Sequence, residues 1–130
     1  MFKCIIVGGT LTASVLVARV VQNRHKVVAE AVVAKDCTTI SWPDWEGGSA
    51  TFRKETVEEV KQMLEPLCRN AEVAFIALPN DEIATKTYTD FFTNKGLRVF
   101  SWPHDIALNT EDKAAYMVHF AEQAYAASTN

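Results

Sequence analysis

The fold is decided near the start of the chain, where residues 2–13 read FKCIIVGGTLTA. The first six of these form an apolar, β-branched run that is typical of a buried strand. Gly8 and Gly9 end the run, and from Thr10 onward apolar residues recur near helical spacing. This stretch therefore predicts a strand, a tight turn at the two glycines and a helix.

The same two patterns alternate through the rest of the chain. We expect further strands at residues 26–33, 50–52, 72–78 and 97–101, and further helices at residues 55–68, 82–94 and from Thr110 onward. Residues 36–48 carry one proline, two glycines and neither periodicity, so we expect a loop there. Such alternation predicts a single α/β domain over residues 1–130. It is a Rossmann-like three-layer sandwich, with a mostly parallel sheet of about five strands and helices on both faces.

Composition and charge exclude several classes of partner. Of the 130 residues, 48% are hydrophobic and 22% are charged, and the net charge is -3, as in a globular protein with one core. Lysine and arginine are scattered along the chain and form no basic stripe, so we expect no nucleic-acid partner. The apolar run at the start is too short for a signal-peptide core or a membrane span. The three widely spaced cysteines favour a reducing compartment, and we expect a cytoplasmic protein without a bound metal.

In an α/β sheet of this kind, ligands bind beyond the carboxyl ends of the strands, where the strand order reverses. The candidate cofactor contacts therefore follow the expected strands. They are Gly8, Gly9, Thr10, Leu11 and Thr12, then Lys35, then Leu78, Pro79 and Asn80, and finally Trp102.

The glycine turn partly matches a dinucleotide-binding turn, which has the sequence G-x-G-x-x-G between a strand and a helix. Ala13 is an accepted substitute for the last glycine, but Thr10 replaces the middle one. The Thr10 hydroxyl and the free N–H groups at the helix start are able to hold an anion. The alternative is that the two glycines only turn the chain. We favour binding of a nucleotide or another phosphorylated small molecule.

The residue after the second strand would select between the two nicotinamide dinucleotides. If Ala34 occupies the ribose position, no acidic side chain meets the 2'-hydroxyl and Lys35 is free to contact a 2'-phosphate, which favours NADP. If Asp36 occupies it, the preference is for NAD. In a third interpretation, Lys35 and Asp36 are only solvated charges in a loop. The sequence does not decide among these three interpretations.

With these residues in view, the chain resembles the N-terminal cofactor domain of the glucose-fructose oxidoreductase and inositol dehydrogenase family. The resemblance covers nearly the whole length and rests on residues 8–13, 74–80, 96–103 and 107–109. It implies NAD(P) binding and a relationship to oxidoreductases. The family's Glu-Lys-Pro, whose lysine supports hydride transfer, falls on Ser101, Trp102 and Pro103, and the family's second domain is missing. We therefore expect no oxidation or reduction of small sugars or alcohols by this chain alone.

A rival resemblance is to the N-terminal domain that precedes the ATP-grasp fold in glycinamide ribonucleotide synthetase and biotin carboxylase. Gly96, Val99, Phe100 and the pair Asp112-Lys113 carry it. That family's Phe-Gly-Pro-Ser falls on residues 100–103, where its glycine and proline are lost. This resemblance implies a fragment of a ligase.

The three tryptophans suggest a surface for another protein. Trp42 and Trp45 stand in the expected loop and Trp102 at a strand end, and exposed tryptophans are enriched at interfaces. The alternative is that they cap the core. Because a second domain covers this half of the resembling enzymes, we expect a homodimer or a complex with a larger protein. Two classes of function remain: a nucleotide-binding domain, and a non-enzymatic interaction or regulatory protein.

Overall fold

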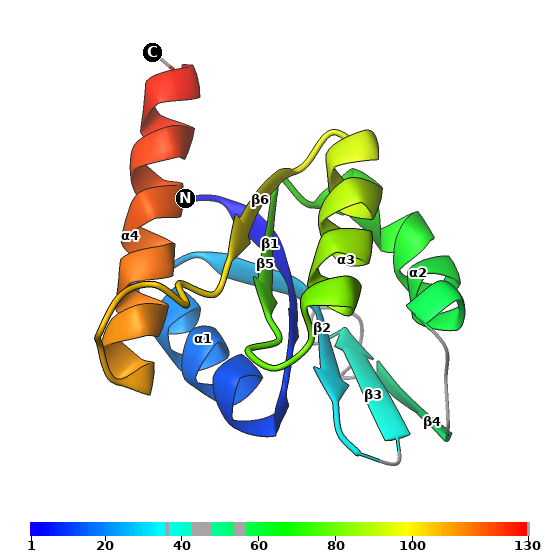
Figure 1. Ribbon diagram of the computed structural model, residues 1–130. Helices are drawn as coiled ribbons and strands as arrows, with labels where there is room; N and C mark the ends of the chain where they lie inside the picture. The colour runs from blue at the N-terminus through cyan, green and yellow to red at the C-terminus, as the bar shows by residue number, and fades with distance from the viewer. Residues whose placement is uncertain (36, 43–47, 54–56, 130) are drawn as a thin grey trace.

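The centre of the molecule is a six-stranded sheet in the order β4-β3-β2-β1-β5-β6 (Figure 1). The computed structural model describes the backbone of residues 1–35, 37–42, 48–53 and 57–129, and the side chains of residues 1–35, 37–41 and 57–127. The strands are β1 (Lys3–Gly8), β2 (Lys26–Val33), β3 (Cys37–Trp42), β4 (Gly48–Arg53), β5 (Val73–Ala77) and β6 (Arg98–Ser101). Strands β2, β1, β5 and β6 run parallel, whereas β3 is antiparallel to both β2 and β4.

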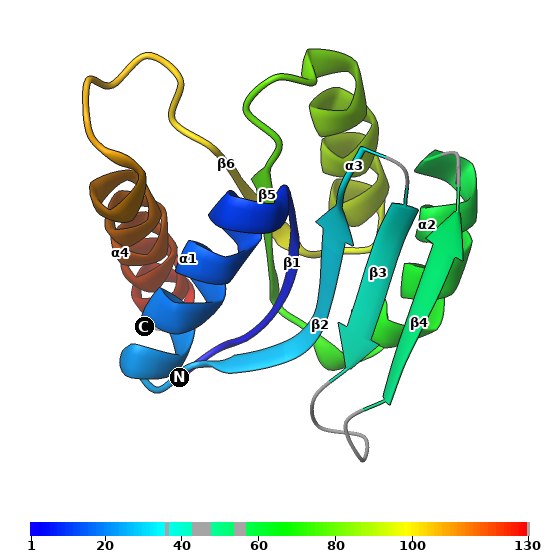
Figure 2. The same ribbon diagram turned by 90° about the horizontal axis from the view of Figure 1, so that it is seen from below.

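Helices cover the sheet on both faces, so the expected three-layer, Rossmann-like sandwich is confirmed (Figure 2). One face carries α1 (Thr10–Gln22) and α4 (Thr110–Thr129). The other carries α2 (Val57–Leu64), the 3-10 helix η1 (Glu65–Asn70) and α3 (Glu82–Asn94). None of the helices in the described ranges is long and apolar enough to cross a membrane.

Strand β1 is buried on both faces. Ile5 and Val7 pack under α2 and α3, while Cys4 and Ile6 pack under α1 and α4, and all four are fully buried. A strand between two helical layers has no solvent face, which explains why its sequence is a continuous apolar run instead of an alternation. Burial also raises the pKa of the Cys4 thiol far above its usual range, so this cysteine behaves as a small apolar side chain.

The expectation of a loop is wrong for residues 37–42, which form β3. Thr38 and Ile40 are buried on one face of the strand, and Thr39 and Ser41 lie partly exposed on the other. β-branched residues favour such a half-buried strand, and the edge of β2 supplies the hydrogen bonds. The expectation is also wrong for Gly48, which is the first residue of β4, and expected loop residues 36 and 43–47 lie outside the described part of the chain.

The second helix is shorter than the expected 55–68. Helix α2 ends at Leu64, and residues Glu65–Asn70 continue as a 3-10 helix with Pro66 in its first turn. Proline lacks an N–H donor and its ring clashes with the preceding turn of an α-helix, which accounts for the change of helix type.

Candidate functional site

The reversal of strand order lies at β1. From β1 the chain first adds β2 and the β3–β4 hairpin on one side, and later adds β5 and β6 on the other (Figure 2). At the carboxyl end of β1, Gly8 is in register with Val32 of β2 and Ala77 of β5. The ends of β1 and β5 therefore border the position where open α/β sheets bind their ligands.

A buried threonine fixes the start of α1 to the end of β5. The Thr12 hydroxyl donates to the Ala77 carbonyl oxygen at 2.7 Å and accepts the Gly9 N–H at 2.9 Å. The Gly9 N–H also lies 3.2 Å from the Ala77 oxygen. Because the Thr12 side chain is only 7% exposed and already bonded, only its backbone N–H is left for a ligand.

The first turn of α1 is open to an anion. Within the described residues, the N–H groups of Thr10, Leu11 and Thr12 have no hydrogen-bond acceptor, and the turn contains no acidic residue. The side chains of Thr10 and Leu11 are exposed. Unpaired N–H groups and the helix dipole give this end of a helix a partial positive charge.

The two glycines of the turn have different roles. A Cβ at Gly8 would lie 3.1 Å from the Ala13 nitrogen and 3.2 Å from the Ala13 Cβ, so Gly8 lets α1 pack closely on β1. A Cβ at Gly9 would meet only the Thr12 Oγ1, at an ordinary 3.5 Å. Ala13, in the place of the third glycine, is fully buried in this packing.

The segment after β5 presents only part of its predicted contacts. Leu78 is buried in the core between the sheet and α3, and its carbonyl oxygen accepts the Asp81 N–H at 3.2 Å. Pro79 is partly exposed and Asn80 is exposed. Asp81 then caps α3, because its carboxylate accepts the Ala84 N–H at 2.9 Å. Pro79 and Asn80 are therefore the side chains that this segment leaves accessible at the ligand edge.

Lys35 lies at the carboxyl end of β2, next to the candidate turn. It is exposed and follows Ala34, whose N–H donates to the Cys37 carbonyl oxygen at 2.9 Å in the turn to β3. Asp36, the other candidate for the ribose, lies outside the described residues. The preference between NADP and NAD therefore stays a prediction.

The prediction that Trp102 supplies exposed contact surface is wrong. Its side chain is 5% exposed and belongs to the core beneath α1 and α4. Its backbone N–H continues the pairing with β5 through the Ile76 oxygen, and the Lys113 Nζ lies 5.9 Å from the ring centroid. Helix α4 returns across the sheet after β6, and this long-range packing encloses the indole. Trp45 lies outside the described residues, as does the side chain of Trp42.

An open groove of about 460 Å³ lies beside the candidate turn. It is lined by Leu11 and Val15 from α1 and by residues 109–111, at the start of α4. Asn109 caps α4, because its Oδ1 accepts the Asp112 N–H at 2.7 Å. No sequence pattern indicated a site role for Thr110 or Glu111. Their proximity to α1 is a long-range contact that no local pattern signals.

No protein-family model matches this sequence, and no curated protein matches it significantly. In the part of the chain that the structure describes, no three His, Cys, Asp or Glu side chains gather as a metal site would require.

Proposed function

We propose that this domain binds a phosphorylated nucleotide at the carboxyl ends of β1 and β5, with the phosphates on the first turn of α1. NADP is the first candidate, and NAD and ATP are the alternatives. One observation carries the proposal: α1 begins where the strand order reverses, with the N–H groups of residues 10–12 unoccupied and no carboxylate in its first turn.

The surroundings of the turn support a ligand larger than phosphate. Leu11 is 64% exposed and lines the groove with Val15, which gives apolar surface for a ring of the ligand. The carboxylate of Glu111 lines the other side of this groove, so the groove suits an uncharged ring and not the phosphates. Lys35, at the neighbouring strand end, supplies a positive charge at the same edge of the sheet.

The proposal is for binding and not for hydride transfer by the chain alone. If the resemblance holds, Trp102 stands where the family has the lysine that supports hydride transfer. An indole neither titrates near neutral pH nor carries a charge, so it cannot take over that role. In this chain the indole is buried beneath α4. Turnover of a nicotinamide cofactor would therefore need catalytic groups from outside these 130 residues.

Thermal melts with NADP, NAD, ATP and no ligand test the proposal. A nucleotide at a hundredfold excess over its dissociation constant is expected to add ~2.7 kcal/mol to the free energy of unfolding. A Thr10→Asp variant should lose this ligand-dependent shift, because a carboxylate at the helix start repels phosphate. Its stability without ligand should stay the same or rise by about 0.3–1 kcal/mol, because the same carboxylate favours the helix dipole.

The control for this experiment is Ala18→Glu, at an exposed position two turns further along α1. It adds the same charge but should keep the ligand-dependent shift. If no nucleotide at millimolar concentration changes the melting temperature of the unmodified protein, the proposed function is wrong.

A second candidate function, protein binding, is favoured by an aromatic pair on α4. Tyr116 and Phe120 are 39% and 50% exposed, and their ring centroids lie 5.6 Å apart. Exposed aromatic side chains are enriched at protein interfaces. We propose that this pair, in place of Trp102, contributes to a homodimer or to a complex with a larger protein.

Light scattering at micromolar concentration measures the homodimer directly. A Tyr116→Ser, Phe120→Ser double variant is expected to shift the mass towards the monomer, since an interface of at least roughly 1,000 Å² depends on a few buried aromatic residues. Ile83→Ser is the matched control, because Ile83 is 83% exposed but lies on α3, on the other face of the sheet. A strictly monomeric parent protein excludes the homodimer.

A further inference from the structure

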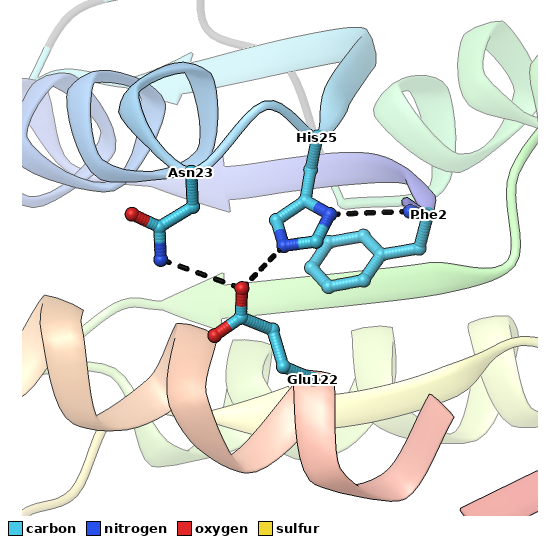
Figure 3. Close-up of polar contacts among 4 residues, drawn as sticks. All are labelled: Phe2, Asn23, His25 and Glu122. Atoms are coloured by element: carbon cyan, nitrogen blue, oxygen red, sulfur yellow. Dashed lines mark hydrogen bonds and ion pairs between the residues drawn. The ribbon is translucent and has the colours of Figure 1, made fainter. Parts of the chain in front are cut away.

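At the end of the sheet opposite the candidate site, one histidine connects three elements (Figure 3). His25 lies between α1 and β2. Its Nδ1 accepts the backbone N–H of Phe2, just before β1, at 3.2 Å, and its Nε2 lies 2.6 Å from the Glu122 carboxylate on α4. The Asn23 amide also donates to this carboxylate oxygen, at 3.4 Å.

These two contacts define the protonation state of the ring. A backbone N–H can only donate, so Nδ1 must be unprotonated to accept it. The Glu122 carboxylate accepts, so Nε2 carries the hydrogen. The neutral Nε2–H tautomer satisfies both neighbours, whereas a doubly protonated ring would place an N–H at Nδ1 against the Phe2 N–H.

The ring is enclosed, so water does not readily replace a lost partner. The His25 side chain is 8% exposed and stacks on the fully buried Phe2, with ring centroids 3.7 Å apart and planes inclined by 6°. The Phe2 ring also packs against the rings of Phe75 and Tyr125, with ring centroids 5.9 Å and 6.1 Å apart. A change at Nδ1 therefore acts on the start of β1 and on its packing.

We propose that His25 is a pH-sensitive switch between β1 and α4. When Nδ1 takes up a proton from solvent, the Phe2 N–H loses its acceptor, while the Nε2–H contact with Glu122 becomes an ion pair between imidazolium and carboxylate. Protonation therefore frees the N–H of Phe2, the residue before β1, and keeps α4 attached to His25. The switch is independent of whether a nucleotide binds at the other end.

The segments at this end of the sheet carry other titratable and charged groups. They are the amino group of Met1, Lys3, Arg24, Lys26, Glu72, Arg98 and Tyr125. Glu72 accepts the Lys3 backbone N–H at 3.2 Å, and its hydrogen bond with Tyr125 raises the pKa of that phenol. Tyr125 thus stays protonated through the acid range. Glu122 is the carboxylate in direct contact with the ring.

Nuclear magnetic resonance of the folded protein between about pH 8 and about pH 5, the range in which histidine changes charge, tests the switch. The nitrogen signals of the His25 ring should report the Nε2–H tautomer at the upper end and proton uptake at Nδ1 on acidification. The Phe2 N–H signal should change with the same midpoint. Its hydrogen exchange, corrected for the intrinsic pH dependence, should rise about tenfold, as expected for losing one hydrogen bond.

Two substitutions of His25 separate the contacts of the ring, and a third, at Glu122, removes the neighbouring charge. His25→Asn keeps an acceptor near the position of Nδ1 but does not titrate, so the pH dependence at Phe2 should disappear. His25→Gln keeps a donor directed towards Glu122, so exchange at Phe2 should be fast at every pH. Glu122→Gln retains the histidine and should move the midpoint to lower pH, because the protonated ring loses its counter-charge.

The ring signals of the unmodified protein decide the matter even if a variant fails to fold. A ring that carries its hydrogen on Nδ1 at the upper end of the range would overturn the proposal. The proposal would also be overturned if the Phe2 N–H signal did not change with the same midpoint as the ring signals. The same holds if the pH dependence of the Phe2 N–H signal persisted in His25→Asn.

Discussion

Replacement of Trp102 by alanine is expected to lower the free energy of unfolding by about 3–5 kcal/mol. The indole is 5% exposed and packs in the core formed by the sheet, α1 and α4. Its removal takes apolar contacts away and leaves a cavity that the surrounding strands and helices fill only in part. Denaturant unfolding followed by circular dichroism measures the change.

Trp102→Phe is the control for this experiment, because it keeps an aromatic ring in the same space and should cost clearly less than Trp102→Ala. A loss below about 1 kcal/mol for Trp102→Ala would contradict the buried position, since substitutions at the surface have effects of that size or less. It would also restore this tryptophan as a candidate for a protein interface.

Gly8→Ala is expected to destabilise the protein by about 1–3 kcal/mol, the usual cost of overpacking a tight contact. The added Cβ would lie 3.1 Å from the Ala13 nitrogen and from the Thr12 Oγ1, so α1 would have to move away from β1. The Thr12 hydroxyl cannot yield easily, because it holds the Ala77 oxygen at 2.7 Å. Thermal unfolding measures the loss.

Gly9→Ala is the matched control at the adjacent position. Its φ of -74° and ψ of 176° suit any residue, and its added Cβ has space. This substitution is expected to change the free energy of unfolding by less than about 1 kcal/mol, because alanine restricts the unfolded chain but is a poorer N-cap residue than glycine. Equal losses for the two variants would show that Gly8 has no special packing role.

The elements with strong local signals were predictable from the sequence. The glycines at positions 8 and 9 correctly predicted the end of β1 and the start of α1. The helix expected at residues 82–94 is α3, with the same bounds. In these segments the apolar period, the flanking turn residues and the cap all favour the same structure. Such agreement between local signals is what makes a segment predictable.

Strand β3 could not be predicted in the same way. Its six residues contain one aliphatic side chain, Ile40, and they precede Pro43 and two glycines, which are signals for a loop. Ladder hydrogen bonds with β2 and β4 decide its conformation, and these depend on partners that a local pattern does not contain.

The candidate site was predictable in place but not in detail. The ends of the expected strands pointed to Gly8 and Asn80. In the structure, Gly8 ends β1 and Asn80 follows β5, and these two strands are neighbours in the sheet. The exposure of each side chain was not predictable. Thr12 and Trp102 are enclosed by contacts with Ala77 and with α4, which lie far away in the sequence.

The central position of β1 has a consequence for synthesis of the chain. Strand β1 leaves the ribosome before the strands that pair with it. Strand β2 soon covers one of its edges, but the other edge pairs with β5, where Cys4 meets Val73. Until β5 emerges, an apolar strand displays unpaired backbone groups to neighbouring nascent chains. Translation products that stop before Val73 should therefore aggregate, and rapid completion of the later half protects the first.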